Sequence, residues 1–194
     1  MTYNLALATH PCPEVELLLL CARTCDGSAR AQRIRDLLQK DLDWLSLLRT
    51  ASQHGVMPLM YHSLKTLCPD AVPQAILAQL HAHFLANTAH NLRLTQELLT
   101  LLHLWESHRV SVIPYKGLTL AAAIYGNLAL RQFGDLDILV RPQDARQARE
   151  LPFARGYRWW DHRPVTAWHR FRKVDELMRA DGHVLVELHT AVTS

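Results

Sequence analysis

Gly134-Asp135-Leu136-Asp137-Ile138-Leu139-Val140 is the stretch that decides the fold of this 194-residue chain. Its apolar and acidic residues alternate, and successive side chains along a β-strand point to opposite faces. The pattern therefore predicts a strand that places Leu136, Ile138 and Val140 on one face and both aspartates on the other. Two carboxylates at this spacing repel each other unless a divalent cation lies between them, so the strand is a candidate metal site.

The sequence before this strand predicts a second strand, a tight turn and a helix. Val110, Val112 and Ile113 form a β-branched run of the kind that favours strands. The turn Pro114-Tyr115-Lys116-Gly117 follows, and a short apolar helix then extends through Tyr125.

The sequence after the strand predicts a helix and a third strand. The helix covers residues 142–155, with a proline in its first turn and Gly156 as its C-terminal cap. Residues 183–189 read His-Val-Leu-Val-Glu-Leu-His and follow the turn Asp181-Gly182, so we expect a strand on which Glu187 and His189 share a face. Glu187 would then add a third carboxylate to the site.

The first half of the chain predicts helices, because apolar residues recur at steps of three and four from about residue 13 to residue 109. The expected helices cover Glu14–Thr24, Ala29–Leu38, Trp44–His54, Pro58–Lys65 and Pro73–His108. The expected fold class is therefore α+β. We expect a helical region over residues 1–109 and, over residues 110–194, a core made of a small mixed β-sheet flanked by helices.

A second Asp-Leu-Asp occurs at residues 41–43, directly before the amphipathic stretch that begins at Trp44. Aspartates at this position cap the start of a helix and interact favourably with its dipole. Helix capping therefore explains this copy of the motif, and we expect no metal there.

Composition sets wide limits on function. The chain has 21 basic and 18 acidic residues, a net charge of +3, so no strong overall field marks it as a nucleic-acid binder. Its four cysteines form no paired Cys-x-x-Cys motifs, which suits a reducing compartment and predicts small buried side chains at Cys12, Cys21, Cys25 and Cys68. The apolar run 15–22 contains an acid, lacks a basic leader and is too short to cross a membrane, so we expect a cytoplasmic protein without a membrane partner.

Several short motifs follow one another in a recognisable order between about residues 110 and 189. They are Lys116-Gly117, Tyr125, Arg131, Asp135-Leu136-Asp137, Gly156-Tyr157 and Val186-Glu187-Leu188-His189. This order resembles the uncharacterised nucleotidyltransferases of the DNA polymerase beta-like superfamily. The resemblance implies a nucleotidyltransferase core of mixed sheet and helices, with an NTP as the donor and Mg²⁺ or Mn²⁺ as the cofactor.

The resemblance also implies roles for the three carboxylates. Asp135 and Asp137 would bind both metal ions. Glu187 would bind the catalytic ion and help to deprotonate the acceptor hydroxyl.

Four further residues are expected to contact the nucleotide. Lys116-Gly117 stands where the superfamily more commonly has Gly-Ser, and its glycine would let backbone amides approach a phosphate while its lysine supplies a point charge. Arg131 would bind the β- and γ-phosphates or serve as an ion-pair partner of the acids. His189 would orient Glu187, contact the nucleotide or make only local hydrogen bonds.

The expected function is transfer of a nucleoside monophosphate from an NTP to a hydroxyl acceptor, with release of pyrophosphate. The acceptor is RNA, a protein or a small molecule, and the base preference and oligomeric state stay open. Residues 157–173 interleave aromatic and basic side chains, which suits either an acceptor surface or a loop packed on the sheet.

Two alternatives stay open. The chain ends only seven residues after Glu187, which leaves room for a core truncated at its C-terminus and for a catalytically silent module that binds a nucleotide or a partner. The other alternative is a glycosyltransferase that uses Asp-x-Asp to hold Mn²⁺ and a sugar nucleotide. It would need a nucleotide-binding α/β region before the motif, whereas a long helical region precedes Asp135 here.

Overall fold

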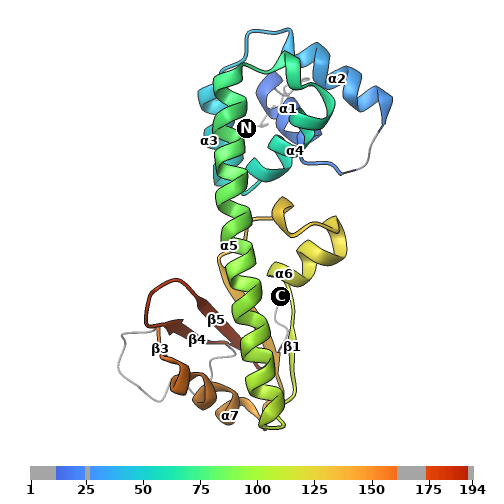
Figure 1. The fold of residues 1–194 in the computed structure, drawn as a ribbon. Coiled ribbons are helices and arrows are strands. Elements are labelled where there is room, and N and C mark those ends of the chain that lie inside the picture. Colours follow the sequence, from blue (N-terminus) through green and yellow to red (C-terminus); the bar gives the residue numbers. More distant parts are fainter. Residues whose placement is uncertain (1–11, 25–26, 161–173, 192–194) are drawn as a thin grey trace, which may run out of the picture. The chain divides into compact units, whose positions relative to one another are not determined.

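The computed structural model describes residues 12–24, 27–160 and 174–191, which form two compact units divided between Asn87 and Thr88 (Figure 1). The first unit is helical, as the apolar spacing predicts. Its elements are α1 (Pro13–Cys21), α2 (Ser28–Leu38), α3 (Trp44–Gln53), α4 (Met57–Leu67), the short 3₁₀ helix η1 (Pro69–Ala71) and the first part of α5 (Gln74–Ser107).

The first unit packs around one cluster of apolar side chains. Leu17, Ile34, Leu47 and Met60 bring α1 to α4 together, and each is almost fully buried. The predicted burial of cysteine is confirmed for Cys21 and Cys68, and burial raises the pKa of the Cys21 thiol to about 12. It is wrong for Cys12, which is exposed because it directly precedes α1 and lies outside the packed helix, and Cys25 lies outside the described residues.

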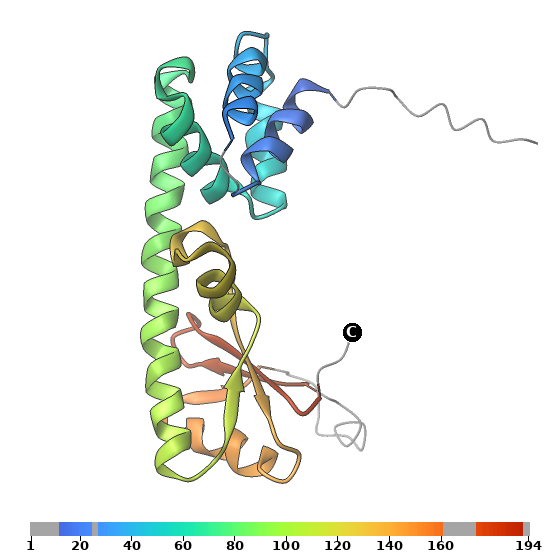
Figure 2. The ribbon, with the colours of Figure 1, turned by 90° about the vertical axis from the view of Figure 1, so that its right-hand side faces the viewer.

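The second unit combines the rest of α5 with a sheet and short helices. In chain order these are β1 (Val112–Pro114), α6 (Gly117–Leu120), the π-helical turn η2 (Ala121–Tyr125), the 3₁₀ helix η3 (Leu128–Leu130), β2 (Asp135–Val140), α7 (Ala145–Glu150), the 3₁₀ helix η4 (Leu151–Arg155), β3 (Tyr157–Trp159), β4 (Val174–Arg179) and β5 (Leu185–His189). The segment from α6 to η3 runs beside α5 (Figure 2). The protein therefore has the expected α+β architecture.

The sheet is mixed, with the strand order β1-β2-β5-β4-β3. The central pair β2 and β5 is parallel, and the other pairs are antiparallel. The strands expected at β1, β2 and β5 are present, but the structure adds β3 and β4. The sequence pattern does not predict β3, which has only three residues, or β4, where two acids interrupt the apolar pattern.

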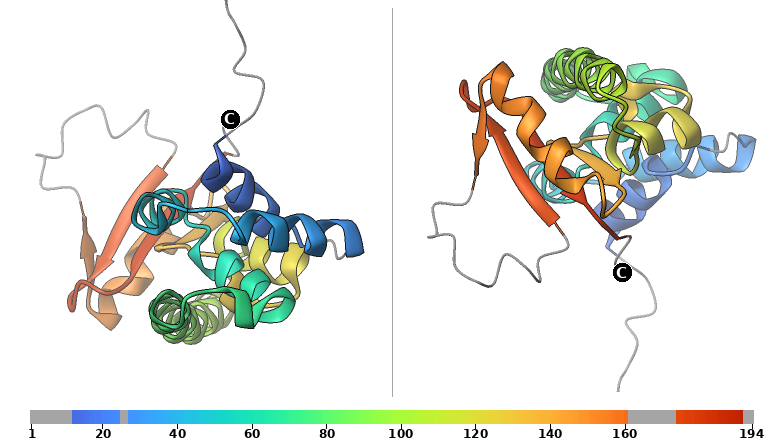
Figure 3. Two further views of the ribbon diagram at one scale, coloured as in Figure 1. Left: turned by 90° about the horizontal axis from the view of Figure 1, so that it is seen from above. Right: turned by 90° about the horizontal axis from the view of Figure 1, so that it is seen from below.

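One face of the sheet is covered by α5 and α7. Leu136, Ile138 and Val140 are buried on this face, as the alternation in β2 predicts. Trp105 of α5 packs in the same cluster, and its indole Nε1 donates to the carbonyl oxygen of Ala148 in α7 at 3.0 Å. The view from below shows α7 lying against the strands, with α5 seen along its axis (Figure 3). The aspartates of β2 therefore lie on the other face of the sheet, which we call the carboxylate face.

Helix α5 belongs to both compact units, since its residues up to Asn87 fall in the first and those from Thr88 in the second. The sequence pattern changes later, at residue 110, and the division into domains 1–109 and 110–194 stays a prediction. Among the described residues, no helix combines the length and the apolar character needed to cross a bilayer.

Candidate metal and nucleotide site

The parallel pairing of β2 with β5 brings the predicted acids together. Asp137 stands directly opposite Glu187 in the register, so both side chains lie on the carboxylate face. His189 follows two residues later on the same face of β5. One ligand atom from each of Asp137, Glu187 and His189 lies within 4.8 Å of the other two, which is close enough for one cation to contact all three.

Asp137 is the centre of this group. Its side chain is only 5% exposed, and its Oδ1 atom accepts a hydrogen bond from the Lys116 ammonium at 2.8 Å. The same oxygen lies 3.1 Å from Nε2 of His189, which is also 3.2 Å from Oε2 of Glu187. A buried carboxylate is costly unless it is paired, so these contacts compensate for its desolvation.

Burial and neighbouring negative charge raise the pKa values of Asp135 and Glu187. Burial raises the pKa of Asp135, and the charge of Asp137 raises it further. Burial also raises the pKa of Glu187, and both aspartates add to that effect. The group therefore favours whatever adds positive charge, either a proton or a metal cation.

The turn before α6 is held against this group by its backbone. The amide of Tyr115 donates to the carbonyl oxygen of Asp137 at 3.0 Å. Gly117 has φ +23°, and a Cβ atom there would lie 3.5 Å from the carbonyl oxygen of Asp135. Lys116 has φ 55° and ψ −144°, a conformation that L side chains rarely adopt, and such strain persists only where the surroundings enforce it.

Arg131 supports the same turn. Its guanidinium Nη1 donates to the carbonyl oxygen of Gly117 at 2.9 Å. The backbone of Arg131 is fixed in turn by Asn91 of α5, whose amide Nδ2 donates to the carbonyl oxygens of Leu128 at 2.6 Å and Arg131 at 2.8 Å. Asn91 was not among the predicted site residues, although a fully buried amide on an otherwise apolar helix face signals such a role.

Two further residues of the site were missed. The ring of Tyr115 meets the His189 ring edge-on at 5.1 Å and lies 5.0 Å from the Lys116 ammonium, so it holds both in place. Glu176 of β4 stands opposite Glu187 in the register and adds a fourth acid to the carboxylate face. Glu176 was missed because the sequence pattern does not predict strand β4, on which it lies.

The aromatic and basic stretch 157–173 is described only in part. Tyr157 is buried and its hydroxyl donates to Glu97 of α5 at 3.0 Å, so this residue packs the β3 strand onto the helix. Trp159 and Trp160 are partly exposed. The remainder, residues 161–173, lies outside the described residues, and the predicted acceptor surface there stays a prediction.

The donor atoms suit a divalent cation. Carboxylate oxygens suit Mg²⁺ and Mn²⁺, and an imidazole nitrogen is a ligand that many transition metals accept. All seven residues expected at the site lie around one patch. They are Lys116, Gly117, Arg131, Asp135, Asp137, Glu187 and His189. The arrangement differs in one respect from the expected triad, because His189 rather than Asp135 completes the group within 4.8 Å.

Comparison with protein families gives one result. A family described as "Uncharacterised nucleotidyltransferase" matches residues 40–194, which is most of the chain and includes every residue of the site. The resemblance drawn from the motifs is therefore confirmed. Comparisons with curated proteins and with solved structures found no match.

Proposed function

Because the chain belongs to this family of uncharacterised nucleotidyltransferases, we propose that it moves a nucleoside monophosphate from an NTP to a hydroxyl acceptor and releases pyrophosphate. The observation that carries the proposal is the pairing of Asp137 with Glu187 across parallel strands, with His189 beside them. The pairing supports the proposal because it brings two carboxylates and an imidazole close enough to share one cation, and metal-assisted phosphoryl transfer needs such a group.

Asp135, Asp137 and Glu187 would hold the metal ions, and Nε2 of His189 is within reach of the same cation. When bound, Mg²⁺ or Mn²⁺ would neutralise the carboxylates and the developing charge on the phosphates. Without a cation, the Lys116 ammonium supplies part of that neutralisation through its ion pair with Asp137.

Lys116, Gly117 and Arg131 would receive the triphosphate. The Lys116 side chain is 47% exposed, so its ammonium can turn from Asp137 toward a phosphate without being drawn out of a packed core. Gly117 lets the backbone adopt a positive φ in this turn, and Arg131 keeps the turn in place. This end of the carboxylate face would therefore hold the leaving pyrophosphate.

In the reaction, the acceptor hydroxyl oxygen would form a bond with the α-phosphorus. The bond between that phosphorus and the oxygen bridging to the β-phosphate would break, and the electron pair would leave with pyrophosphate. Glu187 would accept the proton of the hydroxyl, because its side chain is 24% exposed and burial together with the neighbouring acids raises its pKa.

The test is to incubate the full chain with each α-³²P-labelled NTP, Mg²⁺ or Mn²⁺, and separate pools of RNA, protein and small metabolites. We expect labelled product from the unaltered chain and none from the double variant Asp135→Ala/Asp137→Ala. The matched control is Asp41→Ala/Asp43→Ala, which removes the other Asp-Leu-Asp and should keep the activity. Metal-dependent NTP binding without any product would point instead to a silent binding module, and transfer from a UDP-sugar alone would point to a glycosyltransferase.

A further inference from the structure

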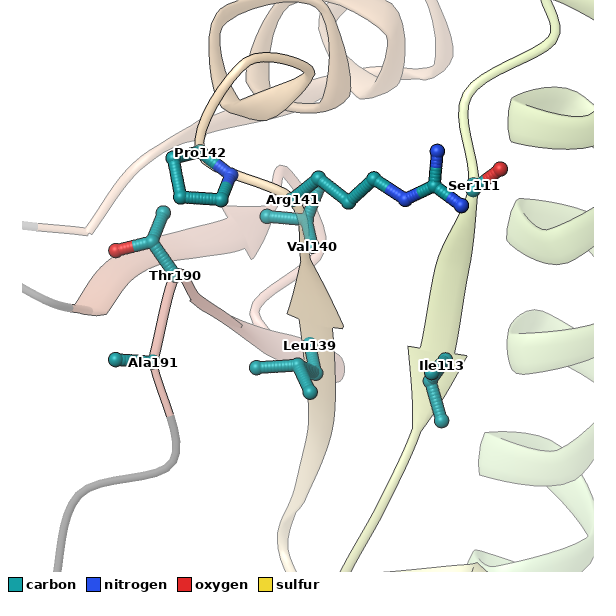
Figure 4. Close-up of a pocket in the computed structure, with 8 residues that line it drawn as sticks. All are labelled: Ser111, Ile113, Leu139, Val140, Arg141, Pro142, Thr190 and Ala191. Carbon is teal, nitrogen blue, oxygen red and sulfur yellow. The ribbon is translucent and has the colours of Figure 1, made fainter.

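A pocket of about 410 Å³ opens beside the proposed metal site (Figure 4). Its walls come from the end of β2, the start of β1 and the residues that follow β5. Ile113, Leu139 and Ala191 supply much of its apolar lining, and Figure 4 shows the Arg141 side chain extending from the end of β2 toward Ser111. The proposed reaction assigns no role to these residues.

The pocket lies on the carboxylate face. Leu139 follows Asp137 by two residues on β2, and Leu139 pairs with Ile113 on one side and with His189 on the other. Paired residues share a face, and a step of two residues along a strand covers about 7 Å. The pocket is therefore one such step from the carboxylates, a distance that a small bound molecule spans.

The pocket and the Lys116-Gly117 turn lie at opposite ends of β2. Strand β1 runs antiparallel to β2, so its last residues approach Asp137, while Ser111, directly before its first residue, lies near Arg141. The attacking oxygen and the leaving oxygen lie on opposite sides of the phosphorus in phosphoryl transfer. If pyrophosphate leaves at the turn, the acceptor must approach from the end where the pocket lies.

We propose that this pocket binds the acceptor, and that the acceptor is a small hydroxyl compound with an apolar body and an anionic group. The proposal rests on the proposed function and adds the substrate class. A volume of about 410 Å³ falls in the range of small-molecule sites, and no aromatic residue that could stack on a base lines the described pocket.

Arg141 is the basis for the anionic group. It is exposed, and no described residue forms an ion pair or a side-chain hydrogen bond with its guanidinium. A guanidinium matches a carboxylate or a phosphate through two parallel hydrogen bonds. The apolar body would lie against Ile113, whose side chain is a large hydrophobic group left 61% exposed at the pocket.

The first experiment measures binding of three probes of one shape and different charge. They are 4-(hydroxymethyl)benzoate, benzyl alcohol and 4-(hydroxymethyl)benzylamine, each titrated by NMR into the full chain with Mg²⁺ and a non-hydrolysable ATP analogue. We expect the anion to bind about tenfold more tightly than the cation, as one favourable charge contact would give. Equal binding of the three probes, or no binding of the anion, overturns the proposal.

Variants then assign the binding to this pocket. Arg141→Glu should reverse the preference between anion and cation, and Arg141→Lys should keep its direction. Arg155→Glu makes the same change of charge at an exposed site in η4, beside α5 and away from the carboxylate face, and should change nothing. An anion preference that survives Arg141→Glu places the probe elsewhere and overturns the assignment.

The same titrations separate this proposal from the proposed function. Binding of the ATP analogue should require Mg²⁺, should be lost in Asp135→Ala/Asp137→Ala, and should persist in Arg141→Glu. If the ATP analogue bound equally well without Mg²⁺, the proposed nucleotidyltransferase function itself would be contradicted. A different result would contradict only the proposal of a small anionic acceptor. In that result the ATP analogue binds normally, label is transferred only to RNA or protein, and Arg141→Glu does not change this transfer.

Discussion

The tripeptide Asp-Leu-Asp occurs twice in this chain, at residues 41–43 and 135–137, and the two copies have different structures. In both, the leucine is buried. In the first copy Asp43 caps α3, and its side chain accepts a hydrogen bond from the amide of Ser46 at 3.0 Å. In the second copy both aspartates lie on β2, and Asp137 pairs with groups that are far away in the sequence.

The difference shows that the sequence separation of the partners, and not the motif, distinguishes a cap from a site. The Asp43 carboxylate is satisfied within three residues, so it needs nothing else from the fold. The Asp137 carboxylate depends on Lys116, 21 residues away, and on His189, 52 residues away. A group that the fold assembles from three distant segments is costly to maintain, which favours a functional role.

The same substitution at the two copies should give the largest contrast. Asp137→Asn removes the charge that would hold the metal and should lower NTP transfer on the order of a thousandfold. Asp43→Asn replaces one good capping residue with another and should leave transfer unchanged. The measurement is the initial rate of label transfer at matched protein concentration, with circular dichroism to confirm that both variants fold. Comparable rates for the two variants would remove Asp137 from the mechanism.

Local patterns predicted much of the fold. Alternation along β2 and β5 was sufficient to assign their side chains to the core face or the carboxylate face, and steps of three and four located the helices of the first unit. Strands β3 and β4 were missed because short, polar strands are defined by their neighbours. Arg158 and Glu176 become strand residues only because Met178 and Glu187 lie opposite them.

The candidate site shows the same limit. Spacing and family resemblance were enough to expect the acids, the Lys116-Gly117 turn and Arg131 in one place. Asn91 and Tyr115 were missed because each acts through a partner that only the folded chain brings near, the η3 carbonyls for Asn91 and the His189 ring for Tyr115. The contribution of His189 to the tightest ligand group likewise depends on the register between β2 and β5.

Metal binding should stabilise the chain through the second copy only. At a Mn²⁺ concentration a hundred times the dissociation constant, we expect about 2.7 kcal/mol of added stability, measured as a rise in the thermal midpoint. Asp41→Ala/Asp43→Ala should show the same rise, and Asp135→Ala/Asp137→Ala should show none. A rise that persists in the second double variant would place the metal at other residues.

This stabilisation should weaken in acid. The pKa values of Asp135 and Glu187 are raised, so protons compete with the metal at a higher pH than ordinary carboxyls, whose pKa values are about 4. The rise in the thermal midpoint caused by Mn²⁺ should therefore be full near neutral pH and should become smaller as the pH falls toward these raised pKa values. A rise that is constant down to about pH 4 would contradict the carboxylates as ligands.

Loss of the cap in the first copy should have a smaller and purely structural effect. Asp43→Ala leaves the amide of Ser46 without its acceptor and should cost about 1 kcal/mol in the free energy of unfolding. Urea denaturation followed by circular dichroism measures this cost, and Asp43→Asn should restore most of it. Full stability in Asp43→Ala would mean that solvent satisfies the helix end as well as the aspartate does.

The smallest expected effect has the opposite sign. Because the folded-state pKa of Asp135 is raised above its unfolded value, its contribution to stability is favourable below about pH 4 and is lost as the pH rises through the folded value. At neutral pH without metal, its charge therefore destabilises the fold. Asp135→Asn should then stabilise the metal-free chain, by less than about 1 kcal/mol because the partly exposed carboxylate is screened by solvent.

The gain should shrink toward pH 4 and disappear when Mn²⁺ is added, since only the unaltered chain gains stability from the metal. Asp43→Asn should show no such gain at any pH, and a gain of equal size at both copies would mean that general charge reduction, rather than repulsion within the site, is the cause.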